Sequence, residues 1–340
     1  MRKTMLTRLM IGALAAGAVA SVALLTPAVR AAEPIKLGYA KCAHCLPMAL
    51  TPGLAEGVAI DATGFNSGND VLTALVSKSL DVAQVTYLHY VTALDKGFDL
   101  VAISGEVNGG SECLSSPGLN LAKGDWASFK AAVEKAKAAG TPLKVAASRG
   151  NAQDIHMRGA FDKQGISVNK DLQFVNIPNP SDHIAALRRG EIDMVCTVEP
   201  FASQIRLAGA GKTFVLPYDQ AAGKLTNIIV TRSDVIAARR ADVQATVATV
   251  VKLVDKLKAD KGVWADVIVK QTGLDRAVAE AALENAYPDY ELHRPETLAI
   301  AAMMKDLKYI SGDVSAQVTK NMDYSFLEAV TKRSKNELGY

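Results

Sequence analysis

Short apolar runs alternate with helix-spaced segments along most of this chain. The spacing of apolar residues distinguishes the two kinds of segment. Residues 70–78 and 87–96 have the spacing of helices. The runs that predict strands are residues 35–39, 58–65, 81–85, 100–104, 143–148, 172–177, 193–198, 213–217 and 227–231. After Ser233 the pattern becomes mostly helical, most clearly at residues 241–258. Such alternation predicts an α/β fold in which mostly parallel sheets are flanked by helices.

Residues 69–86 and 181–198 share one pattern at a constant spacing of 112 positions. In both stretches a polar loop opens a helix, and then an Asp, Asp81 or Asp193, leads a buried strand. Two lobes of similar architecture would produce this pattern, and so would any two helix–turn–strand units. On the first interpretation, lobe 1 comprises residues 32–118 and 218–340, and lobe 2 comprises residues 119–217.

The first 31 residues have the order of an export signal. Arg2, Lys3 and Arg8 precede an apolar run at residues 9–25, and small residues then lead to a cleavage position near Ala31. A run of this length, rich in Ala and Gly, would span a bilayer poorly. We therefore expect a periplasmic protein from which the signal peptide is removed.

The signal changes how the charge is interpreted. It holds four Lys or Arg residues and no acid, so the remainder carries 34 basic against 35 acidic residues, a formal charge of −1. A chain without a basic excess and with 6% aromatic residues is not typical of nucleic-acid binding. The sequence also lacks a Walker loop, a GxGxxG fingerprint, an HExxH motif and a serine elbow. We expect a monomer with no nucleic-acid partner, no cofactor and no resident metal.

Polar loops of small residues follow several predicted strands. Ligands in open α/β sheets bind beyond the carboxyl ends of the strands, beside helix N-termini that favour anionic or strongly polar groups. Gly68 and Gly150 would let a ligand approach the backbone closely. Each loop alone is an ordinary helix cap, but their recurrence predicts a binding cleft. The loops are residues 66–69, 148–151, 179–182 and 197–200.

Two charged residues in these loops bear on the kind of ligand. Arg149 is their only basic residue and could pair with a sulfonate or a carboxylate, although a loop arginine is also often solvated. Glu199 lies at a helix start, where its carboxylate would meet the positive end of the dipole. Its alternative role is to repel oxyanions and to accept N–H donors, which would favour a nitrogen heterocycle.

The order of elements resembles that of the periplasmic-binding family for nitrate, aliphatic sulfonates, taurine and thiamine-pyrimidine precursors. The resemblance covers residues 34–310 and implies the type II periplasmic-binding-protein fold, with a ligand captured between two α/β lobes. It also implies an ABC permease and ATPase as partners. The segments that carry it are residues 35–39, A-L-x-x-x-x-x-D-V at 74–82, K-V-A-A-S-R-G-N-A at 144–152, A-L-R-R-G-E-I-D at 186–193 and V-E-P at 198–200.

By position, the resemblance places the ligand contacts on loops of both halves, and Arg149 joins them through its charge. The implied contacts are Cys42, His44, Cys45, Asn66, Ser67, Gly68, Asn69, Thr86, Tyr87, Gly150, Asn151, Ala152, Glu199 and Asn227. We expect a sulfonate-like or taurine-like organic anion. The alternative is a heterocycle similar to a thiamine-pyrimidine precursor, which Glu199, Asn227 and the Cys/His loop motivate.

The loop after the first strand departs from the family pattern, because it carries Cys42, His44 and Cys45. In an oxidising compartment these cysteines could form a disulfide, within Cys42–Cys45 or from either to Cys113, with Cys196 buried. They could instead bind a thiophilic metal or metal complex, although a structural zinc site needs four ligands. Cys42 also falls where a desulfinase of similar fold carries its nucleophile. No second residue is evident as its base, so we expect a binding protein with no catalytic residue.

Overall fold

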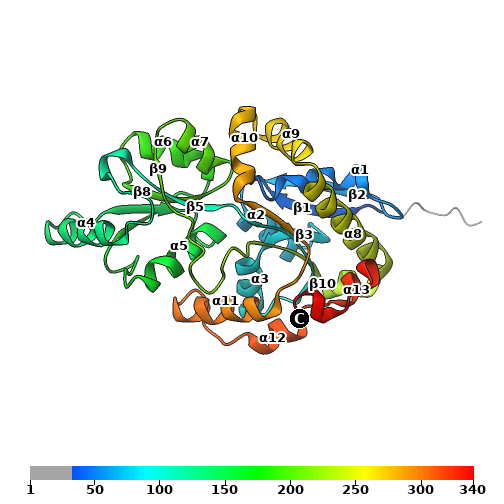
Figure 1. Ribbon diagram of the computed structural model, residues 1–340. Helices are drawn as coiled ribbons and strands as arrows, with labels where there is room; N and C mark the ends of the chain where they lie inside the picture. Colours follow the sequence, from blue (N-terminus) through cyan, green and yellow to red (C-terminus); the bar gives the residue numbers. More distant parts are fainter. Residues whose placement is uncertain (1–32) are drawn as a thin grey trace, which may run out of the picture. The chain divides into compact units, whose positions relative to one another are not determined.

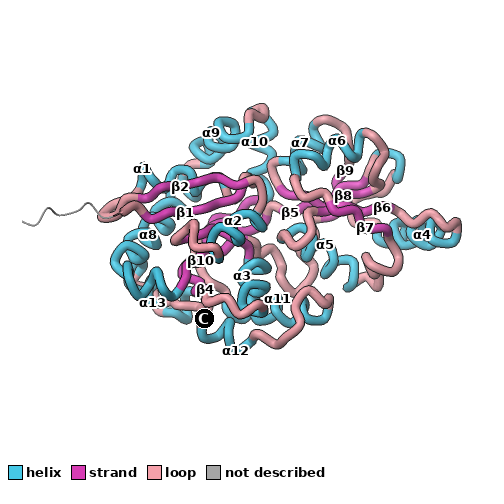
Figure 2. The backbone as a smooth tube through the Cα atoms, turned by 180° about the vertical axis from the view of Figure 1, so that it is seen from behind, coloured by secondary structure: helices cyan, strands magenta, loops and turns pink. Residues whose placement is uncertain are grey.

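The computed structural model describes residues 33–340 and shows two sheets, each flanked by helices (Figures 1 and 2). The predicted signal peptide lies outside the described residues. The first sheet has the order β11-β4-β10-β3-β1-β2, formed by β1 (Ile35–Ala40), β2 (Ile60–Phe65), β3 (Val82–Thr86), β4 (Leu100–Gly109), β10 (Asn227–Arg232) and β11 (Ala286–Asp289). The second has the order β7-β6-β8-β5-β9, formed by β5 (Ser111–Ser115), β6 (Lys144–Ala147), β7 (Gln173–Asn176), β8 (Met194–Val198) and β9 (Lys212–Val215).

The helices alternate with the strands up to β10 and dominate the chain after it. The α-helices are α1 (Thr51–Leu54), α2 (Gly68–Val76), α3 (Tyr87–Asp95), α4 (Trp126–Ala138), α5 (Ala152–Lys163), α6 (His183–Arg188), α7 (Phe201–Leu207), α8 (Ser233–Ala259), α9 (Lys261–Thr272), α10 (Arg276–Ala282), α11 (Arg294–Asp306), α12 (Ser315–Lys320) and α13 (Ser325–Thr331). The 3-10 helices are η1 (Leu46–Leu50), η2 (Pro117–Leu119), η3 (Pro180–Asp182), η4 (Leu283–Asn285) and η5 (Lys335–Leu338). The predicted α/β class and two-lobed type II fold are confirmed.

Both sheets are mixed, whereas the sequence suggested mostly parallel ones. Strand β1 pairs in parallel with β2 and β3, and β6 pairs in parallel with β7 and β8. Strands β10, β11 and β5 run antiparallel to their neighbours. The reason is that the chain crosses between the sheets twice, directly from β4 through Gly110 into β5, and again through residues 216–226. The first crossing, at Gly110, comes before residue 118, where the sequence predicted the end of the first segment of lobe 1. The predicted lobe boundaries stay a prediction.

The internal repeat has the same local structure in both copies. The spacing of 112 residues carries β3 onto β8 and carries α2 onto η3 and α6. Before each strand, the Asp makes the same pair of bonds to a neighbouring strand: Asp81 to Lys36, and Asp193 to Lys144. In both pairs the Asp N–H donates to the Lys carbonyl at 2.8 Å, and the Asp carboxylate accepts from the Lys N–H. The two sheets therefore contain equivalent helix–strand units in equivalent surroundings.

Helix α8 covers the first sheet because of the spacing of its valines. Val243, Val247, Val250 and Val254 recur every three or four residues and are all buried, so they form one apolar face. The helix packs against β4 and α13. Its backbone departs from helical geometry at Arg239, just before the segment 241–258 that the sequence predicted as a helix.

The second sheet has its own core, built around four aromatic rings and a disulfide. Trp126 packs edge-on against Phe161 and Phe214, with ring centroids 5.6 and 4.9 Å apart. Cys113 and Cys196 face each other in the β5–β8 register, with Cα atoms 3.9 Å apart, and form a disulfide in this core. The cross-strand position explains this pairing, which the sequence interpretation did not include.

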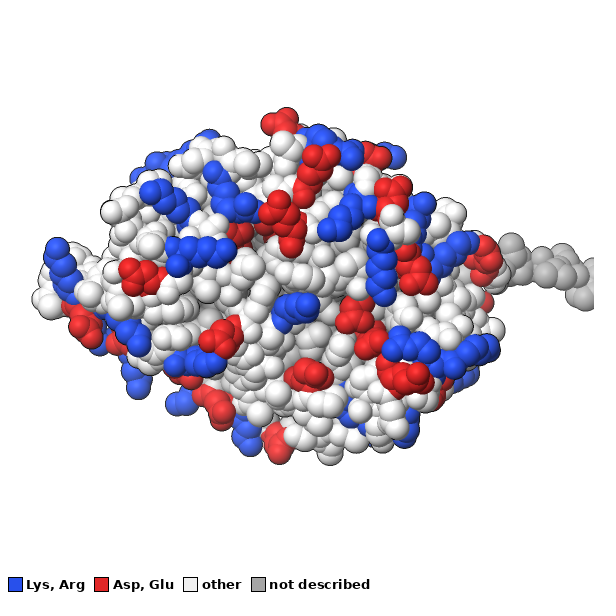
Figure 3. Space-filling view, viewed as in Figure 1, with Lys and Arg blue, Asp and Glu red and all other residues white. Residues whose placement is uncertain are grey.

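Each apolar run predicted as a strand overlaps one, but β5 and β11 were not predicted. Strand β5 has the sequence SECLS, whose polar residues gave no apolar signal although all five are buried. Strand β11 contains Pro288 and lies at a sheet edge, the position where proline is tolerated. Within residues 33–340, none of the helices combines the length and apolar character needed to cross a membrane. On the face shown in Figure 3, basic and acidic side chains are interspersed, without an extended region of one sign.

Candidate functional site

A pocket lies between the two sheets, at the ends of strands and the starts of helices from both. It contains about 470 Å³ of space, including its opening to solvent. The first sheet and its loops contribute Ala40, Lys41, Cys42, His44, Cys45, Asn66, Ser67, Gly68, Gln84, Val85 and Thr86. The second sheet and its loops contribute Asn151, Ala152, Gln153, Pro180 and Val198. The cavity itself measures about 40 Å³, which is room for a few water molecules in this arrangement.

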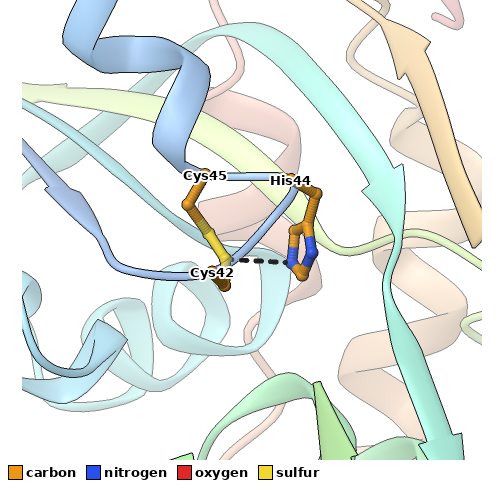
Figure 4. Close-up of side chains that lie close together, drawn as sticks. All are labelled: Cys42, His44 and Cys45. Atoms are coloured by element: carbon orange, nitrogen blue, oxygen red, sulfur yellow. Dashed lines mark hydrogen bonds between the residues drawn. A yellow bond between two sulfur atoms is a disulfide. The ribbon is translucent and has the colours of Figure 1, made fainter. Parts of the chain in front are cut away.

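The cysteine loop, whose side chains Cys42, His44 and Cys45 are drawn in Figure 4, contributes to the lining of the pocket. Cys42 and Cys45 form a disulfide, one of the pairings that the sequence allowed. The Nε2 atom of His44 lies 3.4 Å from the Sγ atom of Cys42. The backbone of Ala43 is held at both ends, because its N–H donates to the carbonyl of Glu199 and its carbonyl accepts from Trp264 Nε1, each at 2.7 Å.

His44 is buried so deeply that its ring is neutral. Burial, together with the smaller effect of the nearby His156, lowers the pKa of His44 to about 3. The Nδ1 atom of His44 has no hydrogen-bond partner. Gly110, at the first crossing between the sheets, makes room for the ring, since a Cβ atom there would lie 2.2 Å from Nδ1. Gly110 also has a φ of +83°, a backbone conformation that favours glycine.

Three helices begin at the pocket. Ser67 caps α2 by accepting from the N–H of Asp70, and Thr86 caps α3 in a capping box with His89. Asn151 precedes α5 but makes no side-chain cap. Because the free N–H groups and dipoles of these helix starts carry partial positive charge, together they favour a negative group in the pocket.

The charged residues of the lining are few. Lys41 is the one charged residue among the lining residues, which include no Asp or Glu. Its Nζ atom lies 3.5 Å from Asn66 Oδ1. Lys41, Asn66 and Pro180 also line a neighbouring outer groove, together with residues from α7 and α9. Lys41 therefore stands between the pocket and this groove.

The structure brings most of the predicted contact residues to the pocket. Those that line it are Cys42, His44, Cys45, Asn66, Ser67, Gly68, Thr86, Asn151 and Ala152. Their role in ligand binding stays a prediction.

The other predicted contacts lie outside the lining, each with a partner of its own. Asn69 bonds His89 and the carbonyl of Arg149, and Tyr87 is buried with its hydroxyl on the carbonyl of Leu292. The guanidinium of Arg149 lies 4.8 Å from the centre of the Phe174 ring. The N–H of Gly150 donates to Asp154, and Asn227 donates to the carbonyl of His44 and to Glu106.

Glu199, the remaining predicted contact, belongs to a buried charged cluster behind the pocket. One carboxylate oxygen accepts from the N–H of Ser203 at 2.9 Å, and the other accepts from Arg206 at 3.2 Å. Arg206 also lies 3.2 Å from Glu112. Burial, together with the smaller effect of the charge of Glu112, raises the pKa of Glu199 to about 7. Glu199 therefore titrates near neutral pH without being part of the lining.

Several lining residues were not predicted. Gln84 lies inside β3, where its Oε1 accepts from the N–H of Ala40 at 3.2 Å, and nothing in the sequence marks it as different from a core residue. Gln153 is 3% exposed, and its side chain makes no hydrogen bond to another described residue. Its position just after the Gly150–Asn151 loop was the available signal. Ala40, Lys41 and Val85 were not predicted either, whereas Pro180 and Val198 belong to predicted cleft loops without having been named as contacts.

Comparisons with known proteins agree with this architecture. Residues 30–269 match the model of the NMT1-like family. No curated protein sequence matches the chain. Among solved structures, the periplasmic nitrate-binding protein NrtA of Synechocystis is 16% identical, with a TM-score of 0.75 and 88% of each chain covered.

Two further solved structures share the fold at similarly low identity. The ligand-binding component of an ABC-type import system from Staphylococcus aureus, solved with zinc bound, is 17% identical. Its TM-score is 0.71, over 89% of this chain and 99% of that one. The alkanesulfonate-binding protein SsuA of Xanthomonas axonopodis, bound to MOPS, is 19% identical, with a TM-score of 0.69 over 85% and 99% of the two chains.

Proposed function

Because this chain belongs to the NMT1-like family, we propose that it is the solute-binding component of an ABC importer and captures a small organic anion between its lobes. Several proteins that share its fold are named as binding components for nitrate or sulfonates. The proposal carries that general role to this chain. A sulfonate or taurine-like compound is the ligand class that its own pocket supports best.

The distribution of charge around the pocket supports an anionic ligand. The starts of α2, α3 and α5 meet at the pocket, and Lys41 stands at its opening. The lining residues include no carboxylate that would repel an anion. A negative group therefore gains from backbone dipoles and from one full positive charge.

The rest of the lining suits a short carbon chain with a polar end. Val85, Val198 and Pro180 supply apolar contact. The side chains of Asn151 and Gln153 make no hydrogen bond to another described residue, so both amides are available to a ligand. Each amide can donate and accept, which suits the ammonium or hydroxyl group of a substituted sulfonate.

A nitrogen heterocycle has weaker support than an anion. Glu199 and Asn227 motivated that alternative, but both are fully buried, lie outside the lining and bond to other protein groups. A Cys-dependent reaction also has weak support, because Cys42 is paired with Cys45 and offers no thiolate in this state. We therefore propose a binding role without turnover.

The proposal includes the setting of the protein. An exported monomer, released from its signal peptide near Ala31, would meet its solute in the periplasm. It would then deliver the solute to an ABC permease with its ATPase. Closure of two lobes around a ligand is the established way in which such two-lobed folds retain small molecules.

Isothermal titration calorimetry of the purified, oxidised protein tests the ligand class. The panel contains ethanesulfonate, taurine, nitrate, a thiamine-pyrimidine precursor and ethyl methyl sulfone, which resembles a sulfonate without its charge. We expect a sulfonate or taurine to bind and to raise the melting temperature, while the neutral sulfone does neither. If only the pyrimidine precursor bound, the proposal that the ligand is an anion would be rejected. Equal binding of the sulfone and the sulfonates would show that charge does not select the ligand.

A further inference from the structure

The pocket wall formed by the cysteine loop also brings three soft donor atoms together. One ligand atom from each of Cys42, His44 and Cys45 lies within 4.8 Å of the other two. All three residues are buried and line the pocket. The imidazole has Cys42 as its only hydrogen-bonding neighbour among the described residues, since Nδ1 has no partner. The ring is thus directed at sulfur rather than held by a carboxylate or a carbonyl (Figure 4).

The separation of these atoms matches that of two ligands on one metal ion. Two donors on a tetrahedral zinc ion, a thiolate and an imidazole nitrogen, lie about 3.5 Å apart when the bonds have their usual lengths. Cys42 Sγ and His44 Nε2 are 3.4 Å apart. Two thiolates on the same ion lie about 3.8 Å apart. The cysteine sulfurs therefore need only to separate from disulfide contact, by side-chain rotation, to take their places.

The loop backbone is held by bonds that do not depend on the disulfide. The N–H groups of Cys45 and Leu46 both donate to the carbonyl of Cys42. Trp264 holds the carbonyl of Ala43, and Asn227 holds the carbonyl of His44 at 2.9 Å. Because these bonds remain when the Sγ–Sγ bond is broken, the two thiols and the imidazole stay preorganised.

We propose that the reduced protein binds one thiophilic divalent cation through Cys42, His44 and Cys45, with a fourth coordination position open to the pocket. Sulfur and imidazole donors select zinc-like ions, and the lining offers no carboxylate to a hard cation such as Ca²⁺ or Mg²⁺. Three protein ligands plus an open position form the arrangement in which a metal can also bind a small molecule. This site goes beyond the proposed function, which concerns the oxidised protein.

Conversion between the two states is a balanced two-electron exchange. A dithiol reductant attacks the Cys42–Cys45 disulfide, breaks the Sγ–Sγ bond and leaves two thiols on the protein and one disulfide on the reductant. Metal binding then releases the two thiol protons to solvent. The Cys113–Cys196 disulfide is fully buried in the second core, so the reductant reaches the pocket pair first.

Cobalt titration tests the site, because Co²⁺ reports thiolate coordination by its absorption. The purified protein is reduced with a trialkylphosphine, which leaves as the phosphine oxide with oxygen from water. Excess reductant is removed without oxygen, thiols are counted by alkylation and mass spectrometry, and Co²⁺ is added. We expect two accessible thiols, one equivalent of bound Co²⁺ with sulfur-to-metal charge-transfer absorption, and displacement of that Co²⁺ by Zn²⁺.

Matched variants separate the contribution of Cys42 and Cys45 from that of Cys113 and Cys196. A Cys113→Ala/Cys196→Ala protein should keep the cobalt spectrum, and a Cys42→Ser/Cys45→Ser protein should lose it. His44→Ala should weaken cobalt binding at least about tenfold, the smallest loss usual when groups that support a metal are changed. The oxidised wild-type protein, which has the same fold and no thiols, should show no sulfur-to-metal charge-transfer absorption with Co²⁺ and serves as a control that needs no substitution.

Three results would overturn the proposal. They are the absence of charge-transfer absorption in the reduced wild type, its persistence in the Cys42→Ser/Cys45→Ser protein, and its dependence on Cys113 and Cys196. None of these measurements uses a sulfonate, so failure here leaves the proposed transport role untouched.

Discussion

The N–H of Ala43 donates a hydrogen bond of 2.7 Å to the backbone carbonyl of Glu199. Ala43 lies between the two cysteines of the pocket loop, and Glu199 follows β8 in the second sheet. The N–H of Glu199 in turn donates to the carbonyl of Gly110, where the chain crosses between the sheets. One continuous set of backbone bonds thus joins the pocket wall to the crossing, so substitutions at either end should affect both.

Substitution of Lys41 tests the charge of the pocket. We expect Lys41→Gln to weaken the binding of an anionic ligand by about tenfold at low salt, because it removes a charge-assisted hydrogen bond worth about 1.5 kcal/mol. The difference should shrink as salt is added, since Lys41 is exposed. Titration calorimetry at two ionic strengths measures both effects. Lys135→Gln, an exposed change on α4, is the control, and equal affinity of the two variants would show that Lys41 does not contact the ligand.

Gly68 lies at the pocket, close to His89 of the first lobe and to Asn151 of the second. A Cβ atom there would lie 2.5 Å from His89 Cε1 and 3.0 Å from Asn151 Oδ1, which belongs to the second lobe. Overpacking of this kind costs about 1–3 kcal/mol. We expect Gly68→Ala to lower ligand affinity about tenfold, because the contact with Asn151 opposes the approach of the two lobes, whereas the contact with His89 acts within the first lobe. Gly53→Ala, which meets no atom within 4 Å, should bind as the wild type does. An unchanged dissociation constant for Gly68→Ala would contradict the closed geometry.

Glu199 should make stability depend on pH. Burial and the charge of Glu112 together raise the pKa of Glu199 to about 7, whereas an unfolded glutamate titrates at about 4.3. Between these values the folded state holds a proton that the unfolded state releases. The free energy of unfolding therefore falls as pH rises through this window, and this contribution levels off above about pH 7.

Glu199→Gln removes that dependence. We expect the stability of the variant relative to the wild type to increase by about 2–4 kcal/mol between about pH 4 and about pH 8. Urea unfolding at several pH values provides the measurement. Glu134→Gln, a change of an exposed carboxylate on α4, should follow the wild-type curve. If the Glu199→Gln and wild-type curves ran parallel, Glu199 would not be the titrating group.

The two disulfides should contribute unequally to stability. Cys113 and Cys196 are 83 residues apart in sequence, whereas Cys42 and Cys45 are three apart. If a disulfide acts by restricting the unfolded chain, the longer loop contributes about 4.5 kcal/mol and the shorter one about 2 kcal/mol. Urea unfolding of Cys113→Ala/Cys196→Ala and of Cys42→Ser/Cys45→Ser checks the order. A larger loss from the pocket pair would mean that the loop contributes through packing rather than chain entropy.

Much of the fold follows from apolar periodicity alone. Every apolar run predicted as a strand overlaps one, and the spacing that suggested a repeat carries β3 onto β8. Strand β5 was missed because its burial depends on partners that lie far away in sequence: Glu112 bonds Thr213, and Cys113 bonds Cys196. The orientation of β10 likewise depends on where the chain crosses back, which no local pattern records.

The sequence predicted those parts of the candidate site that depend on the course of the backbone. It did not predict the parts that depend on the direction of individual side chains. Loops at the carboxyl ends of strands predicted nine residues of the lining, because parallel strands in α/β folds place such loops at one edge. Arg149 was selected for its charge, but its guanidinium lies on Phe174, and Lys41 holds the corresponding position at the pocket. Arg149 and Phe174 are neighbours in space but not in the chain, so the order of residues in the sequence does not reveal their contact.

The hydrogen bond from Trp264 to Ala43 has a consequence for the fluorescence of the protein. Trp264 and Trp126 are the only tryptophans of the chain, and they lie in different cores. Trp264 touches the backbone of the cysteine loop, while Trp126 packs among the phenylalanines around the other disulfide. Each half of the protein therefore has its own fluorophore. Emission from a protein that retains a single indole would follow events at the loop and in the second core separately, without any attached dye.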